Sequence, residues 1–494
     1  LWARLMNGNH VFNTGQPMYH DLVSYTNTHV WFDPEWLSSA LIYFVQVKFG
    51  AIGLTLLKGL FIFLILVMIS IAIKARKPDS YPFNLGYYVV LLLIAQQSSI
   101  LIFSFRCQVI TFFLMGLWIF LLEKIKAGND KLLYLLPFLM LLWLNTHGGC
   151  IAGVGILFLY GIGEFLNKKP YKKYFIALIF VCLAFLINPW GLDYIKFIIE
   201  SSYLDRSWIS EWQSPFSAPL NHHIVYKSLL LFTIFSYGYK IWWKKLKYKD
   251  LNKTKLLVLI VLAMLSAKYV KHEGLFIVIY SIFMYDDYFL VFNHLMEKLR
   301  AYLQIDKTVS KYWVYLKEIL LYLIIYVYSF IIFLTYPVGS SYWENFFATY
   351  PVYPLKFLQA NKIEGKLFSG FYNGSYLAYK GYPDIKIYMD GREEQVYSAE
   401  LFDESMFFMN WIGEYPEAVL DKNPPDIFLL EKGWDCIKHL EENKEYVKIY
   451  SDNKYIIFVK KNLAKFGYKQ PLKNDEYIIR TLFDTNHDYR KLRK

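Results

Sequence analysis

The chain has 494 residues, of which 56% are apolar, 20% aromatic and only 19% charged. Soluble globular proteins carry about 25% charged residues, so this composition argues against an ordinary soluble globular fold. The net charge of +12 does not require a nucleic-acid partner, because much of the lysine and arginine lies in short loops between apolar runs, where it sets membrane orientation. The composition predicts a protein that crosses a lipid bilayer several times.

Residues 1–36 are polar and predict a loop. The opening "LWARLMNGNHVFNTG" has neither the charged nor the apolar region of a signal peptide. The segment 37–50 is too short to span a bilayer and either lies in the interface or extends the first helix.

Long apolar runs follow, and they predict an all-α polytopic membrane domain with about 10 transmembrane helices over residues 1–336. The candidate spans are 51–73, 86–104, 108–123, 132–147, 150–166, 174–188, 225–241, 256–270, 275–292 and 316–336. Several are shorter than the roughly 20 residues that a straight span needs.

The loops between these runs alternate in charge. Five loops are rich in lysine or arginine, namely 74–85, 123–131, 167–173, 240–255 and 293–315. Cytoplasmic loops carry such an excess, so the opposite loops and everything after residue 337 are predicted to be extracytoplasmic. The predicted location is a membrane that the chain crosses several times, with its C-terminal part on the extracytoplasmic side.

The amino-acid composition changes near residue 337, where charged residues, prolines, glycines and short β-branched or aromatic runs appear. Four segments predict strands, namely 385–390, 426–430, 447–452 and 455–461, and the segments near 400–411 and 434–445 predict helices. Residues 337–470 are therefore expected to form a small extracytoplasmic α/β domain, followed by a basic polar tail at 471–494. The four cysteines are scattered without metal-site spacing and predict no structural disulfide.

The first outer loop, 1–50, carries three carboxylates, on Asp21, Asp33 and Glu35. Carboxylates above a bilayer suit a general base or a metal ligand. The alternative is an ordinary wet loop whose aromatic residues anchor it at the headgroups.

Other polar groups stand at predicted extracytoplasmic helix ends. They are Arg106 in "FSFRCQ", His147 in "WLNTHGGC", Glu211 and Trp212 in "SWISEWQSP", and Lys271 and His272 in "KYVKHEG". The cationic groups suit a phosphate, and their alternative role is interfacial anchoring or helix capping. Asp390 and Arg392 in "MDGR" either bind an acceptor or pair with each other in a turn, and we favour the pairing.

The order of these motifs resembles that of a group of bacterial multi-pass membrane proteins related to the GT-C glycosyltransferases, the superfamily of protein mannosyltransferases and lipid A aminoarabinose transferase. The resemblance rests on "LWARLMNG", "HDLVSYT", "WFDPEWL", "RCQ", "NTHGG", "NPWG", "ISEWQSP", "VKHEGLF" and "NGSYLAYKGYPDIKIYMDGR". "RCQ" and "VKHEGLF" depart from the R-P-Q and R-N-x-P-L-F of that group.

The resemblance implies an inverting transfer of a sugar from a polyprenyl-phosphate donor to a glycan, lipid or protein acceptor of the cell envelope. It implies that Asp33 and Glu35 line the catalytic pocket, that Asp21 supports them, and that Arg106, His147, Lys271 and His272 lie near the donor phosphate. No cofactor is certain, although some members of the superfamily use a divalent metal such as Mg or Mn. The group's leading acidic pair and a preceding helix would lie before Leu1, so the chain is expected to be truncated at its N-terminus.

Two rival functions remain open. One is a non-catalytic membrane scaffold whose outer α/β domain binds an envelope glycan or protein. The other is a transporter, although the sequence shows no inverted repeat or pair of broken helices.

Overall fold

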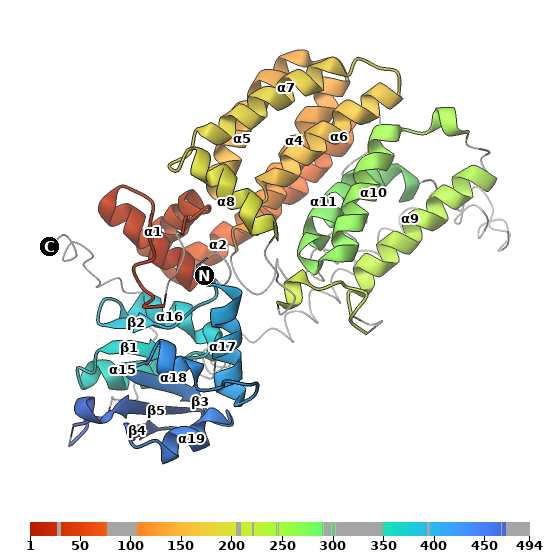
Figure 1. Ribbon diagram of the computed structural model, residues 1–494. Helices are drawn as coiled ribbons and strands as arrows, with labels where there is room; N and C mark the ends of the chain where they lie inside the picture. Colours follow the sequence, from red (N-terminus) through yellow and green to blue (C-terminus); the bar gives the residue numbers. More distant parts are fainter. Residues whose placement is uncertain are drawn as a thin grey trace. The chain divides into compact units, whose positions relative to one another are not determined.

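A computed structural model describes residues 1–26, 31–76, 106–203, 209–219, 222–243, 245, 247–288, 290, 298, 302, 349–392, 396–465 and 467–470 (Figure 1). The chain divides into two compact units. Unit 1 comprises Leu1–Leu54, Lys196–Asp205 and Pro337–Lys494, and unit 2 comprises Thr55–Ile195 and Arg206–Tyr336. The predicted spans 86–104 and 316–336 and the predicted tail lie outside the described residues.

Unit 1 contains a five-stranded mixed sheet in the order β2-β1-β3-β5-β4. Its strands are β1 (Gly365–Phe368), β2 (Ile385–Ile387), β3 (Ile427–Glu431), β4 (Tyr446–Ser451) and β5 (Tyr455–Lys460). β1 pairs in parallel with β2 and β3, whereas β5 pairs antiparallel with β3 and β4. The four predicted strands are confirmed as β2 to β5, and β1 is an addition.

Helices cover both faces of this sheet. They are α15 (Val352–Ala360), α16 (Phe371–Gly381), α17 (Ala399–Asn410), α18 (Ala418–Lys422) and α19 (Cys436–Glu442), with a 3-10 turn η9 (Lys461–Leu463) after β5. The predicted helices near 400–411 and 434–445 are confirmed as α17 and α19. α15 and α16 pack on β5 and β2, and α17, α18 and α19 contribute to the core on the opposite face.

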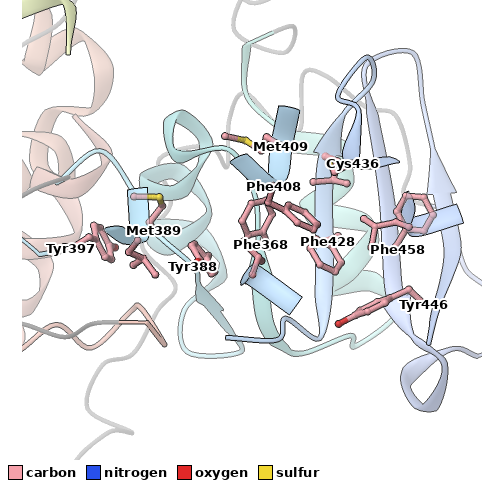
Figure 2. Packing of buried hydrophobic residues seen from close by; sticks show 14 of the residues in the cluster. Phe368, Tyr388, Met389, Tyr397, Phe408, Met409, Phe428, Cys436, Tyr446 and Phe458 are labelled. Atoms are coloured by element: carbon pink, nitrogen blue, oxygen red, sulfur yellow. The ribbon is translucent and has the colours of Figure 1, made fainter. Parts of the chain in front are cut away.

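A row of phenylalanines forms the centre of that second face. Phe368 of β1 is the pairing partner of Phe428 of β3, which in turn pairs with Phe458 of β5. Phe408 of α17 stacks on Phe428 with ring centroids 5.4 Å apart (Figure 2). The strand period of two places all three strand residues on one side of the sheet, and their burial holds α17 in place.

The predicted N-terminal loop is partly wrong, because Trp2–Thr14 form the helix α1. Trp2, Leu5 and Met6 are buried, and the Trp2 ring lies 5.2 Å from Tyr376 of α16. These contacts stabilise a helix whose asparagines and glycine have little intrinsic helix propensity.

Two helices have residues in both units. α2 runs over Trp36–Arg76 and is kinked by non-helical backbone at Gly50, so the segment 37–50 forms a helix that leads into the first apolar helix through this kink. Gly50 has a φ of 62°, a conformation that glycine adopts without a steric penalty. α8 runs over Leu192–Tyr203.

Unit 2 is helical throughout its described residues. Its α-helices are α4 (Gln108–Lys126), α5 (Leu135–Thr146), α6 (Cys150–Leu166), α7 (Lys172–Leu183), α9 (Ile224–Trp242), α10 (Lys253–Lys268) and α11 (Glu273–Phe283). Its 3-10 helices are η2 (Asp130–Tyr134), η3 (Ala184–Leu186), η4 (Ser210–Trp212), η5 (Tyr248–Asp250) and η6 (Val270–His272).

The expectation of about ten transmembrane helices is wrong. Within the described ranges, two helical segments are long and apolar enough to cross a membrane, Ile52–Arg76 and Gln108–Lys126. α5 and α7 have 12 residues each, and at 1.5 Å per residue such a helix is about 18 Å long, compared with a hydrocarbon core of about 30 Å. Turns and 3-10 segments interrupt the apolar runs, so these runs do not form continuous helices of membrane-spanning length.

Candidate functional site

Asp33, one of the predicted catalytic acids, is fully buried in unit 1. Its Oδ1 lies 2.5 Å from Nη1 of Arg4, and its Oδ2 accepts hydrogen bonds from Asn7 at 2.9 Å and from Ser39 at 3.1 Å. Oδ1 also accepts the backbone N–H of Glu35 at 3.1 Å. These bonds join the start of α2 to α1, so the carboxylate has a structural role in this arrangement.

Glu35 is more accessible than Asp33. Its side chain is 17% exposed, and its Oε2 lies 3.1 Å from Nε of the same Arg4. Arg4 therefore lies between both predicted acids, and its single positive charge offsets one of their two negative charges. Of the three predicted carboxylates, Glu35 is the one with the most exposed side chain.

Asp21 belongs to a buried network with residues near the end of β2. Its Oδ1 lies 2.9 Å from Nη1 of Arg392, whose Nε donates to Oδ1 of Asp390 at 2.8 Å. The side chains of these three residues are at most 1% exposed. The favoured pairing of Asp390 with Arg392 is thus confirmed, and Asp21 is a second carboxylate on the same guanidinium.

Ser24 and Tyr397 complete this network. Their hydroxyl oxygens are 2.6 Å apart, and each lies 3.3 Å from Nη2 of Arg392. The indole of Trp31 lies against the guanidinium, with its ring centroid 4.9 Å from Cζ. Burial raises the pKa of Asp21, but the Arg392 charge and hydrogen bonds outweigh burial, so this pKa lies below its ordinary value of 3.8.

The same segment extends the sheet. Ser24 forms a parallel bridge with Ile387 of β2, and the Ile387 N–H donates to the Val23 carbonyl at 2.9 Å. The Tyr25 N–H donates back to the Ile387 carbonyl at 3.1 Å. The first loop thereby covers an edge strand whose backbone groups would otherwise lack these partners.

Five of the six predicted substrate-binding residues come together in unit 2. Arg106, just before α4, forms an ion pair with Glu211 of η4. Lys271 of η6 lies over the ring of Trp212, with Nζ 4.2 Å from the ring centroid. His272 approaches the same indole, with ring centroids 6.4 Å apart. We call these five residues the Arg106 cluster.

Backbone contacts hold the Arg106 cluster in place. The Val270 N–H donates to the Gln213 carbonyl at 3.0 Å, which joins η6 to the residue after η4. The Ser214 hydroxyl donates to the Ala267 carbonyl at 2.7 Å. Burial, with a smaller effect from the Lys271 charge, lowers the pKa of His272 to about 4, so its imidazole is neutral at physiological pH.

His147, the sixth predicted residue, lies beside the first turn of α4. Its Nδ1 is 2.8 Å from the Thr111 hydroxyl and accepts the Gly149 N–H at 2.9 Å. Thr111 also accepts the indole N–H of Trp143 at 2.9 Å. Because Thr111 is five residues after Arg106, His147 is placed at the same end of α4, where its contacts are those of a helix-capping residue.

The sequence interpretation missed a pair in the same region. His223 precedes α9 with a φ of 55°, and its Nδ1 lies 3.0 Å from Oε1 of Glu273, the first residue of α11. Burial raises the pKa of Glu273, and His223 partly offsets this effect. Glu273 directly follows His272 in the chain, but nothing in the sequence connects it to a histidine fifty residues earlier.

A different set of charges gathers at the opposite ends of the same helices. Lys126, at the end of α4, lies 2.7 Å from Glu164 of α6, which also accepts a 2.7 Å hydrogen bond from Thr254 at the start of α10. Lys173 pairs with Asp130 at 2.6 Å. The lysine-rich loops thus meet at one end of α4 and α10, and the Arg106 cluster lies at the other.

The part of the chain that the structure describes holds no group of three or more histidine, cysteine, aspartate or glutamate side chains able to bind a metal ion. The four cysteines are free thiols. A comparison with known protein families finds no match, and a comparison with curated proteins finds none.

Proposed function

We propose that the protein is a membrane glycosyltransferase that moves a sugar from a polyprenyl-phosphate donor to an envelope acceptor on the extracytoplasmic face. The observation that carries the proposal is the Arg106 cluster, in which three separate segments bring two cationic side chains and an indole together. Arg106 suits a phosphate because its guanidinium donates two parallel hydrogen bonds. Its present partner Glu211 is partly exposed and would yield this position to the donor phosphate.

The reaction proposed at this site needs one base and one leaving-group site. The acceptor hydroxyl loses its proton to the base, its oxygen bonds to the anomeric carbon, and the bond from that carbon to the donor phosphate oxygen breaks. Arg106 and Lys271 would stabilise the phosphate that leaves. Within unit 2, His223 is the candidate base, because its contact with Glu273 uses Nδ1 and leaves Nε2 to accept a proton. Glu35, in unit 1, is the base that the sequence resemblance implies.

Exposed apolar side chains in unit 2 support contact with lipid. On α7, Ile176, Ile179 and Phe180 are each more than half exposed, and on α9 Leu231 and Ile234 are as well. Soluble proteins rarely expose large contiguous apolar patches. A donor with a polyprenyl chain would be held beside such surfaces.

The proposal is tested by sugar transfer with the full chain in proteoliposomes that contain tritiated hexose linked to undecaprenyl phosphate and an extract of envelope acceptors. Arg106→Ala and Lys271→Ala should each lower transfer about tenfold or more, since charged hydrogen bonds to phosphate contribute about 1.5–3 kcal/mol. Lys173→Ala is the matched control, because it breaks an ion pair at the opposite helix ends and should leave transfer unchanged.

Two results would contradict the proposal. One is the absence of transfer by the wild-type chain from undecaprenyl-phosphate-linked glucose, galactose and mannose, each tested as the hexose donor. The other is equal transfer by the wild type and both variants. Glu35→Gln and His223→Ala then separate the two candidate bases, since only the variant that lacks the base should lose the rise of the rate with pH.

The membrane scaffold is the second candidate function. Its support is that Asp21 and Asp33, two of the three predicted acids, are buried in ion pairs that join segments of unit 1. A scaffold would need these carboxylates for stability alone. The Asp33→Asn variant would then be less stable than the wild type, and the transfer assay would detect no sugar transfer by the wild type or by the variant.

A further inference from the structure

In the parallel part of the unit 1 sheet, successive strands are added on opposite sides of β1. From β1 the chain passes through α16 to β2 on one side, and from β2 it returns through α17 and α18 to β3 on the other side of β1. In open α/β sheets, ligands bind outside the carboxyl ends of the strands at such a switch point. A ligand bound at this switch point would therefore contact the residues that follow β1 and β3.

Aromatic side chains stand at these two strand ends. Gly370 follows β1, and a Cβ placed there would lie 2.7 Å from the ring of Trp434, which follows β3. The indole therefore packs directly against the backbone where β1 leads into α16. Tyr372, two residues after Gly370, is 79% exposed, and its ring lies against that of Phe371 with the ring centroids 3.7 Å apart.

Polar groups lie at the same two strand ends. Glu431, the last residue of β3, accepts a hydrogen bond on Oε1 from the Asn373 amide of α16 at 3.2 Å. Its Oε2 lies 3.6 Å from Nζ of Lys454, and its side chain is 32% exposed. Asn373 is buried and fixes the carboxylate, which can still reach a ligand with its exposed face.

We propose that these residues form a saccharide-binding site, with Trp434 and Tyr372 against the apolar face of a sugar ring and Glu431 accepting hydrogen bonds from its hydroxyl groups. Ligand sites combine aromatic walls with a few fixed polar groups, and both are present here. A negatively charged ligand such as a nucleotide fits less well, because the carboxylate would repel its phosphates. This inference concerns unit 1 alone and stands independently of sugar transfer in unit 2; it would also give the scaffold its glycan site.

The test is binding of chitohexaose, cellohexaose and maltohexaose, each titrated into the full chain in detergent and followed by calorimetry. Wild type should bind at least one of these oligosaccharides. Tyr372→Ala should weaken that binding about tenfold, and Glu431→Gln should weaken it as well, because a neutral amide is a poorer acceptor. Tyr415→Ala removes another exposed tyrosine of unit 1 (47% exposed) and should bind as wild type does.

Tyr372→Ala is the more informative variant because it removes a largely exposed ring that contacts the neighbouring Phe371 ring. Trp434→Ala also removes a side chain that packs against the core and can disturb the fold. The proposal is overturned by wild type that binds none of the three oligosaccharides, or by binding that Tyr372→Ala and Glu431→Gln leave unchanged. Since no donor lipid is present, neither result depends on whether the chain transfers sugar.

Discussion

Arg392 lies between two carboxylates from distant parts of the chain, and this position decides its role. Asp390 is a near neighbour, but Asp21 is 371 residues earlier in the sequence. Two carboxylates on one buried guanidinium stabilise a fold mainly because removal of the cation leaves both without compensation. Asp21 thus holds the first loop to the α/β part of unit 1.

Replacement of Arg392 with methionine should lower the free energy of unfolding of unit 1 by about 3–5 kcal/mol at pH 7, because buried charges would lose their partner. Urea unfolding of the full chain in detergent, followed by a Trp31 signal taken as the difference from a Trp31→Phe chain, measures this change, since the chain has 14 tryptophans. The depressed pKa of Asp21 means that its contribution is present above its ordinary value of 3.8 and is lost as the pH falls through the lower folded value. Asp21→Asn should remove this acid-dependent part, and an unchanged acid profile would contradict the assignment.

The sequence predicted the pairing of Asp390 with Arg392 but not the pairing of Asp21 with the same guanidinium. The pairing of Asp390 with Arg392 follows from a spacing of two residues in a turn. By contrast, Asp21 resembles any acid of a polar loop, because its partner is set by tertiary structure. The same limit hid the pair of His223 with Glu273.

Elements of unit 1 pack closely where glycine permits it. A Cβ on Gly374 of α16 would overlap the Met389 carbonyl oxygen and the Cα of Asp390. The helix therefore approaches the end of β2 more closely than any other residue would allow, and this approach lets Ser375 donate to Oδ2 of Asp390 at 2.9 Å.

Gly374→Ala should destabilise unit 1 by about 1–3 kcal/mol because overpacking forces the helix away from β2. Thermal unfolding measured by circular dichroism gives the direction. Gly155→Ala is the control, since this α6 glycine has open space around its Cβ position and alanine favours a helix by about 1 kcal/mol. Equal effects of the two substitutions would show that the close approach has no energetic importance.

Short runs of β-branched and aromatic residues made four strands of unit 1 predictable, whereas β1 and α1 lack such a pattern. β2 to β5 contain β-branched and aromatic residues in short runs, which predicts strands. β1 is the four-residue segment "GKLF", too short for a pattern to stand out. α1 combines buried apolar residues with asparagine and glycine, so its helix depends on packing against α16 rather than on propensity.

At the scale of the whole molecule, segments that are far apart in the sequence belong to the same compact unit. The prediction treated residues 1–50 as a loop of the helical domain, whereas contacts group Leu1–Leu54 with the α/β part. β-Strand addition at β2 and the Arg392 network create this association. No local pattern reports such contacts, since they join segments more than 350 residues apart.

The distribution of charge along the helices of unit 2 predicts which end of α4 faces the cytoplasm. The lysine-rich loops meet at one end of α4, through Lys126 and Glu164, and the Arg106 cluster lies at the other. If a bilayer surrounds these helices, the lysine-rich end should face the cytoplasm. Cysteines placed at the two ends should then differ in their accessibility from outside the cell.

Asn129→Cys and Ser217→Cys place one exposed thiol near each end, in a Cys182→Ser background that removes the exposed native cysteine and leaves three buried thiols. In spheroplasts, a membrane-impermeant maleimide should label the cysteine at position 217 at once. The cysteine at position 129 should react only after permeabilisation, and the background chain should react little. Labelling of both positions in intact spheroplasts, or of position 129 alone, would exclude the proposed orientation. Because the assay reads the protein's position rather than its chemistry, it would place the Arg106 cluster on one side of the membrane whether or not sugar is transferred there.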